Sequence, residues 1–123
     1  MPAPLVSVVV PCYRPGQLID GCLDDLLAQD LPGPYEIIVV ESTGDGTAER
    51  LRSRYPGIRV IAPPTRTFPA EAQNIGVAAA SAPFIAITNH DCRLPRDWLQ
   101  RHLARHGTGS YAAVGGAVTN GTP

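Results

Sequence analysis

Two apolar, β-branched runs constrain the fold of this chain more than any other feature. Residues 5–11 read Leu-Val-Ser-Val-Val-Val-Pro, and residues 35–41 read Tyr-Glu-Ile-Ile-Val-Val-Glu. Apolar runs of this length are typical of strands buried on both faces of a parallel sheet. We therefore expect a sheet that helices cover on both sides.

Helical patterns alternate with these strands along the chain. Between the two runs, apolar residues recur in pairs at every fourth position over residues 17–29, which predicts a helix. The later predicted elements are a helix at 47–54 capped by Thr47, a strand at 58–62, a helix at 70–80, a strand at 84–88, a helix from Pro95 and Asp97 to His106, and a fifth strand at 111–118. This alternation predicts an α/β fold of three layers, α/β/α, with a mostly parallel sheet.

The composition limits both the size of the protein and its chemistry. The 123 residues are expected to form one domain, 1–123. All ten basic residues are arginine, which excludes Schiff-base enzymes, pyridoxal enzymes and Walker phosphate loops, because each needs a lysine. A net charge of −1 gives no electrostatic footprint for nucleic acid, so none is expected as a partner.

Charge is distributed unevenly along the sequence. Residues 1–49 carry one arginine and eight acids, whereas residues 50–123 carry nine arginines and three acids. Such asymmetry favours either a bound charged ligand or two solvated faces of opposite sign, and the sequence leaves both open. A solvated face is the favoured interpretation of the arginines around the last helix, and contact with phosphates or an anionic lipid acceptor is the alternative; they are Arg93, Arg96, Arg101 and Arg105.

The cysteines and the hydropathy of the sequence indicate the cellular compartment of the protein. Cys12, Cys22 and Cys92 are odd in number and show no paired-ligand spacing, which favours a reducing compartment over a disulfide framework. No segment has the features of a signal peptide or of a transmembrane span. We therefore expect a cytoplasmic protein.

The polar and aromatic residues of interest follow the predicted strands. Ligands of parallel sheets bind at the carboxyl ends of the strands. There Tyr13 would stack on a base, Glu41 would accept hydrogen bonds from a base or ribose, and Asp91 would hold a divalent cation. The loops concerned are 11–14, 41–46, 63–68 and 89–92. Together they suit a nucleoside diphosphate.

These loops also admit other interpretations. Tyr13 would serve equally to cap the first helix, and Asp91 to cap a turn. A dinucleotide site is excluded because Gly44 and Gly46 are followed by Glu49 where the third glycine of the motif belongs.

Four segments, taken in order, resemble a known family. They are residues 6–13 (Val-Ser-Val-Val-Val-Pro-Cys-Tyr), residues 37–47 (Ile-Ile-Val-Val-Glu-Ser-Thr-Gly-Asp-Gly-Thr), residues 72–76 (Ala-Gln-Asn-Ile-Gly), and residues 84–92 (Phe-Ile-Ala-Ile-Thr-Asn-His-Asp-Cys) with Pro95, Trp98 and Leu99. Their order and spacing resemble the nucleotide-binding half of a family 2 glycosyltransferase with the GT-A fold. The resemblance covers nearly the whole chain.

The resemblance implies that the chain binds a nucleotide-diphosphate sugar and transfers the sugar, with inversion, to an acceptor hydroxyl on a saccharide, lipid or protein. It places Asn89 and Asp91 at the family's metal motif, where they would hold Mn²⁺ or Mg²⁺. The residues predicted to bind the nucleotide are Pro11, Tyr13, Arg14, Glu41, Ser42, Arg66, Gln73 and Asn74. A homo-oligomer stays open.

The sequence departs from the family pattern in three ways. Asn89 replaces an acid, which weakens a divalent site by about 1 kcal/mol or more. The acidic loop is one residue shorter than usual and begins with Glu41. No residue matches the family's catalytic base, so we expect a donor-binding fragment or a shortened relative. The alternative is a non-catalytic nucleotide-sugar-binding or assembly protein that retains the fold.

Overall fold

The computed structural model describes residues 3–119 and contains a four-stranded parallel sheet with strand order β3-β2-β1-β4. The strands are β1 (Val6–Cys12), β2 (Tyr35–Glu41), β3 (Arg59–Ile61) and β4 (Phe84–Ile87). The helices are α1 (Leu18–Leu27), α2 (Thr47–Arg54), α3 (Pro69–Ala79) and α4 (Trp98–His106). These elements match the predicted ones to within a few residues at each end.

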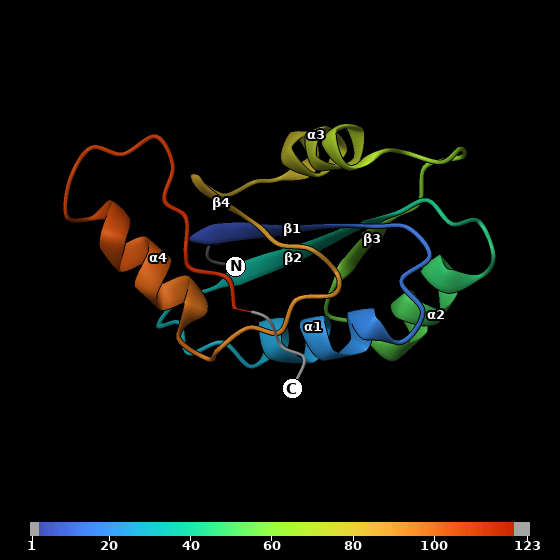
Figure 1. Ribbon diagram of the computed structural model, residues 1–123, viewed down its shortest axis with the longest axis horizontal. Coiled ribbons are helices and arrows are strands. Elements are labelled where there is room, and N and C mark those ends of the chain that lie inside the picture. Colours follow the sequence, from blue (N-terminus) through green and yellow to red (C-terminus); the bar gives the residue numbers. More distant parts are fainter. Residues whose placement is uncertain (1–2, 120–123) are drawn as a thin grey trace.

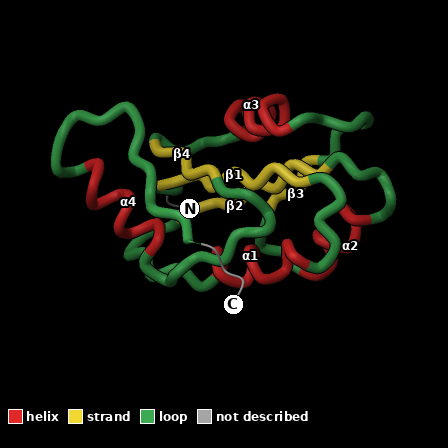
Figure 2. The backbone as a smooth tube through the Cα atoms, viewed as in Figure 1, coloured by secondary structure: helices red, strands yellow, loops and turns green. Residues whose placement is uncertain are grey.

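Helices cover the sheet on two sides, so the predicted three-layer arrangement is confirmed. In Figures 1 and 2, α1 and α2 lie on one face of the sheet and α3 lies on the other. The helix α4 lies at the far end of the molecule from α2 (Figure 1). Leu99 of α4 is buried in the same apolar cluster as the inner residues of α1.

The central strand β1 supplies both halves of the core. All seven of its residues are buried. Successive side chains of a strand point to opposite faces. Val8 and Val10 accordingly join the larger cluster with α1 and α2, whereas Val9 faces Gly76 of α3. Neither face of β1 is open to solvent.

A carboxylate fixes the amino ends of the strands. Glu36, at the start of β2, accepts hydrogen bonds from the hydroxyl of Ser7 and from both the backbone N–H (2.8 Å) and the hydroxyl (2.7 Å) of Ser81. Burial raises the pKa of Glu36, but these hydrogen bonds outweigh it and hold the pKa below its usual value. The contacts join β1, β2 and the segment that leads into β4.

The prediction that the sheet is covered on both faces is wrong for β4. Phe84, Ile85 and Ile87 are 40–43% exposed. The reason is geometric, because β4 is an edge strand and α3 packs on β1 and β2 instead.

The predicted fifth strand at residues 111–118 is also wrong, since the structure shows irregular backbone over that range. Gly115 and Gly116 interrupt the segment and offer no side chain to pack. Val118 is 91% exposed, so its side chain packs against no apolar surface.

The predicted cap of α2 is displaced by one position. Thr47 is the first residue of the helix, and the cap is Gly46, whose φ of 93° lies in the left-handed region that glycine tolerates. Asp45 accepts hydrogen bonds from the backbone N–H (3.2 Å) and the hydroxyl of Thr47. A carboxylate therefore stabilises the helix N-terminus from one residue further upstream.

The close approach of α3 to β1 yields a stability prediction. A Cβ at Gly76 would collide with Cγ1 of Val9, which is fully buried. Gly76→Ala is expected to lower the free energy of unfolding by about 1–3 kcal/mol, measured by urea denaturation, although alanine favours helix. Gly57→Ala is the matched control, because its Cβ would meet nothing within 4 Å. Equal losses in the two variants would contradict the packing argument.

Candidate functional site

The loops that follow β1, β2 and β3 are joined by hydrogen bonds at one end of the sheet. The backbone N–H of Arg14 donates to Oγ1 of Thr43 at 2.8 Å. The backbone N–H of Thr67 donates to Oγ of Ser42 at 2.9 Å, and both of these residues are buried. The loop after β2 therefore holds its two neighbours in place.

Glu41 has a structural role that its sequence position did not reveal. It is only 1% exposed, and its Oε1 accepts the backbone N–H of Thr43 at 2.7 Å. The carboxylate therefore folds back into its own loop and shapes the turn. Burial, with a contribution from the charge of Glu41, raises the pKa of the Cys12 thiol to about 12, so Cys12 stays neutral at physiological pH.

Arginine and aromatic side chains form a stack across these loops. The guanidinium carbon of Arg66 lies 4.1 Å from the ring centroid of Tyr13 and 4.8 Å from that of Phe68. The guanidinium carbon of Arg14 lies 5.4 Å from the Tyr13 centroid. We call these four residues the aromatic–arginine stack. Sequence reasoning missed Phe68, which is 63% exposed; an aromatic residue beside the helix-starting Pro69 was the available signal.

The loop after β4 presents oxygen ligands to solvent. Asn89 and Asp91 are exposed. The backbone carbonyl of Asn89 accepts hydrogen bonds from the N–H of Cys92 (3.2 Å) and from the thiol of Cys22 (3.5 Å). These contacts fix the turn while leaving both side chains available. Within residues 3–119, no three His, Cys, Asp or Glu side chains gather as a metal site.

Helix α1 anchors the segment that continues from this loop. Asp25 accepts hydrogen bonds from Nε (2.8 Å) and Nη2 (3.1 Å) of Arg93 and from the backbone N–H of Leu94 (2.8 Å). The hydrogen bond from Arg93 is the main reason that the pKa of Asp25 lies below its usual value. Gln29 adds a second anchor, with Oε1 accepting the backbone N–H of Leu99 at 2.9 Å.

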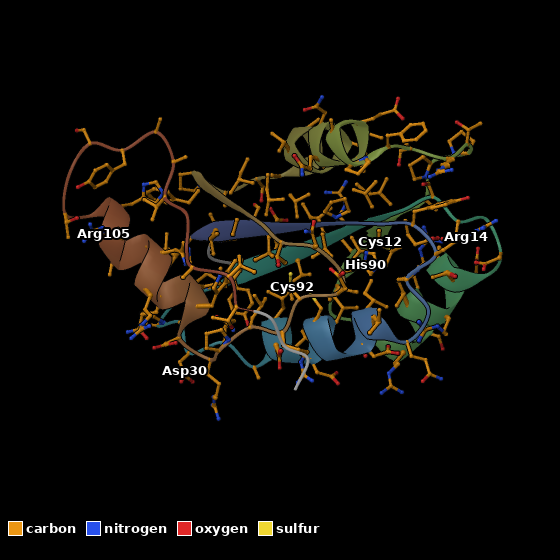
Figure 3. All side chains as sticks on the ribbon, in the orientation of Figure 1. Cys12, Arg14, Asp30, His90, Cys92 and Arg105 are labelled. Atoms are coloured by element: carbon orange, nitrogen blue, oxygen red, sulfur yellow. The ribbon has the colours of Figure 1, made fainter. Side chains whose placement is uncertain are left out.

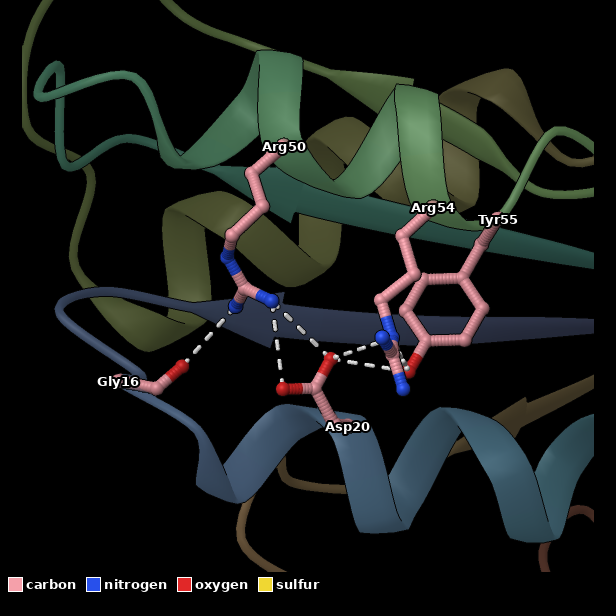
Figure 4. Close-up of polar contacts among 5 residues, drawn as sticks. All are labelled: Gly16, Asp20, Arg50, Arg54 and Tyr55. Carbon is pink, nitrogen blue, oxygen red and sulfur yellow. Dashed lines mark hydrogen bonds and ion pairs between the residues drawn. The ribbon is translucent and has the colours of Figure 1, made fainter.

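The uneven charge distribution is explained by ion pairs between elements. Figure 4 shows Asp20 of α1 with Arg50 at 3.1 Å, Arg54 at 3.6 Å and the hydroxyl of Tyr55 at 2.9 Å. Asp25–Arg93 and Asp30–Arg96 are further pairs of this kind. Acids of the first 49 residues thus pair with arginines of the remainder, an arrangement that neither sequence interpretation included.

The predicted site residues are distributed over three places. Gln73, Asn89 and Asp91 line a hollow of about 1270 Å³ beside β4 and α4. Arg14 lines a second hollow of about 690 Å³ with Asp20, on the α1 and α2 side of the sheet. The other predicted residues line neither hollow; they are Pro11, Tyr13, Glu41, Ser42, Arg66 and Asn74.

Three of the predicted site residues lie apart from the loops, and one of them, Gln73, is on α3. Pro11 is buried within β1, opposite Val40, and Asn74 is exposed on α3. Figure 3 shows Arg14 near the carboxyl ends of β1 and β2, with His90 in the loop after β4. The joined loops therefore bring together Tyr13, Arg14, Ser42 and Arg66, among the predicted residues.

Comparison with known proteins decides the family. The sequence profile of Glycosyl transferase family 2 matches residues 7–122. The chain belongs to this family. It is 29% identical over 120 residues to the glycosyltransferase AglE of Haloferax volcanii and 34% identical over 101 residues to the uncharacterized glycosyltransferase EpsJ of Bacillus subtilis. These alignments span 94% and 80% of this chain, but only 40% and 29% of the two relatives.

Solved structures agree with the fold. S. aureus TarS 1–349 superimposes with a TM-score of 0.74 at 23% identity, covering 84% of this chain and 32% of TarS 1–349. The mannosyltransferase PcManGT from Pyrobaculum calidifontis, in complex with GDP-Man and Mn²⁺, superimposes with a TM-score of 0.70 at 30% identity, covering 83% of this chain and 32% of PcManGT. The GT-A fold implied by the sequence resemblance is thereby confirmed. Across residues 3–119, no helix has both the length and the apolar character needed to cross a membrane.

The anchoring of the loop after β4 gives a pH-dependent prediction. Because the pKa of Asp25 is lowered in the folded state, its stabilising effect is present above the unfolded value of about 3.9 and is lost as the pH falls through the lower folded value. Asp25→Asn is expected to lower the free energy of unfolding at pH 7 by about 1–3 kcal/mol. The difference from the unmodified protein should shrink below about pH 4.

The control for this variant is Asp24→Asn, because Asp24 is exposed and forms no ion pair with another residue of the described part. Urea denaturation at several pH values measures both variants. A deficit in Asp25→Asn that is independent of pH would contradict the assigned role of the carboxylate.

Proposed function

We propose that this chain is the donor-binding part of an inverting family 2 glycosyltransferase and that its ligand is a nucleotide-diphosphate sugar. The observation that carries the proposal is the convergence of the loops after β1, β2 and β3 around Tyr13, at the sheet end where parallel α/β proteins bind ligands. Family membership supports it. PcManGT was solved with GDP-Man and TarS with UDP, the latter superimposing at a TM-score of 0.71 and 25% identity.

Each part of the donor has a matching chemical group in this proposal. Tyr13 stacks on the nucleobase, and the turn shaped by Glu41 and Ser42 faces the base and ribose. Arg14 and Arg66 supply the cations for the diphosphate. Guanidinium groups suit this role because they form paired hydrogen bonds with phosphate oxygens, and the chain has no lysine to replace them.

Asn89 and Asp91 fit a divalent cation as a partial ligand set. Both side chains are exposed after β4 and offer oxygen atoms, which Mn²⁺ and Mg²⁺ accept. Phosphate oxygens and water would complete the coordination, as is usual for Mg²⁺. A cation held by these residues would neutralise charge on the leaving diphosphate. Asn89 contributes no charge, so we expect a weaker site than two carboxylates would form.

The proposal assigns no residue of this chain to the acceptor site or to the catalytic base. In this proposal residues 1–123 form one donor-binding domain, and the chain spans 40% of AglE and 29% of EpsJ. The acceptor is a hydroxyl of a saccharide, lipid or protein. We place the protein in the cytoplasm, because Cys12, Cys22 and Cys92 are all free thiols.

A second candidate function is nucleotide-sugar binding without catalysis. The replacement of an acid by Asn89 favours it, since a weakened cation site would support binding better than transfer. Turnover by a protein that contains this chain would eliminate this candidate.

The stacking role of Tyr13 is tested by calorimetry with UDP-sugars and GDP-sugars. Tyr13→Ala is expected to weaken binding by about tenfold or more, because stacking of a base on an aromatic side chain contributes about 1–3 kcal/mol. Tyr111→Ala is the control, since Tyr111 is a half-exposed tyrosine in the irregular segment after α4. Binding of neither donor by the unmodified chain would refute the proposed function.

The metal site is tested by repeating the titrations with Mn²⁺ added. Mn²⁺ is expected to raise the affinity of the unmodified chain for the diphosphate donor. In Asp91→Ala this increase should disappear, while the affinity for a nucleoside without phosphate stays the same. Glu49→Gln, which removes one exposed carboxylate from α2, should retain the increase. An increase that persists in Asp91→Ala would remove Asp91 from the site.

A further inference from the structure

Arg66 already lies over the ring that the proposed function assigns to the nucleobase. Its guanidinium carbon is 4.1 Å from the centroid of Tyr13 and 4.8 Å from that of Phe68. Arg66 forms no ion pair with a carboxylate of residues 3–119. Its contacts with the two aromatic rings are therefore the interactions that hold its charged end.

The backbone next to Arg66 is held by hydrogen bonds, so the contact between Arg66 and Tyr13 belongs to an anchored loop. The next residue, Thr67, is buried and bonds through both its N–H (2.9 Å) and its hydroxyl (3.2 Å) to Oγ of Ser42. Pro69 begins α3 two residues later. Arg66 can swing its side chain away from Tyr13, but its Cα stays beside the Tyr13 loop.

A guanidinium and a nucleobase compete for the same kind of surface. Both are planar and stack on an aromatic ring. A base cannot stack on the part of Tyr13 that Arg66 covers unless the guanidinium leaves. The guanidinium carbon of Arg14 lies near the same ring, at 5.4 Å from its centroid, and the backbone N–H of Arg14 is bonded to Thr43.

We propose that Arg66 occupies the base-stacking surface of Tyr13 in the ligand-free protein, and that nucleotide binding exchanges this guanidinium for the base and transfers Arg66 to the diphosphate. The inference rests on the proposed function and adds a specificity determinant to it. A nucleoside without phosphate displaces Arg66 and gives it no new partner. A nucleoside diphosphate displaces Arg66 and then binds it, so the exchange selects diphosphates over nucleosides.

The test compares the affinities of the unmodified chain and of Arg66→Ala for uridine, UDP, guanosine and GDP by calorimetry. Removal of the competing guanidinium should raise nucleoside affinity about two- to fivefold, the equivalent of an exposed cation–π contact. The same variant should bind the diphosphates about tenfold more weakly, because it loses a charge-assisted hydrogen-bonding partner. The two affinities are thus expected to change in opposite directions.

Arg105→Ala is the matched control, since Arg105 is an exposed arginine on α4 at the other end of the molecule (Figure 3). It should leave all four affinities unchanged. Thermal denaturation should show that both variants fold as the unmodified chain does, because neither side chain is buried.

A ligand-free measurement tests the contact itself. The side-chain protons of Arg66 should show an upfield ring-current shift by NMR, and Tyr13→Leu should remove the Tyr13 part of that shift. Saturation with UDP or GDP should change the shift further.

The outcomes separate the exchange from the proposed function. Suppose that the unmodified chain binds UDP or GDP, and that Arg66→Ala binds nucleosides no more tightly than the unmodified chain does. Arg66 then does not compete with the base. The exchange is then overturned, while donor binding stands. If the unmodified chain binds neither diphosphate, donor binding fails and the exchange fails with it.

Discussion

The burial of β1 is the constraint on which the rest of the structure depends. The strand pairs with β2 on one edge and with β4 on the other, and its seven residues are covered on both faces. It therefore has no freedom to shift in register without exposing valine side chains or leaving backbone groups unpaired. Near its start, Ser7 donates a hydrogen bond to Glu36, and Tyr13 follows directly after its last residue. The position of the proposed base-stacking residue is thus set by the most buried strand.

The two sides of the candidate site are held by different means. On one side, Ser42 and Thr43 hold the loops after β1 and β3 by direct hydrogen bonds. On the other side, Asp25 and Gln29 of α1 hold the chain that follows β4. The hydrogen bonds that hold the two sides come from different segments, so a donor that reaches from Tyr13 to the loop after β4 would bridge two separately held surfaces. This arrangement gives a bound diphosphate the opportunity to couple them.

The sequence was most informative where residue type and local pattern agreed, and least informative where a tertiary neighbour decided the outcome. The valines of β1 and the paired apolar residues of α1 predict their elements because both patterns need only a buried surface. Residues 111–118 fail as a strand because they pair with no strand within residues 3–119. Glu41 illustrates the limit for the site: its position after β2 suggests a ligand group, and only the geometry of the turn shows the carboxylate bonded to Thr43.

The pairing of acids early in the chain with arginines later in it has a consequence for biosynthesis. The first 49 residues leave the ribosome with eight acids and one arginine, and like charges that lie close together repel. Asp20 has its full set of partners only once Tyr55 has been made, and Asp25 gains its ion-pair partner only once Arg93 has been made. The outer face of α1 therefore reaches its native set of ion pairs only once the chain has been translated beyond β4. Completion of this helix surface therefore comes much later in synthesis than the helix itself.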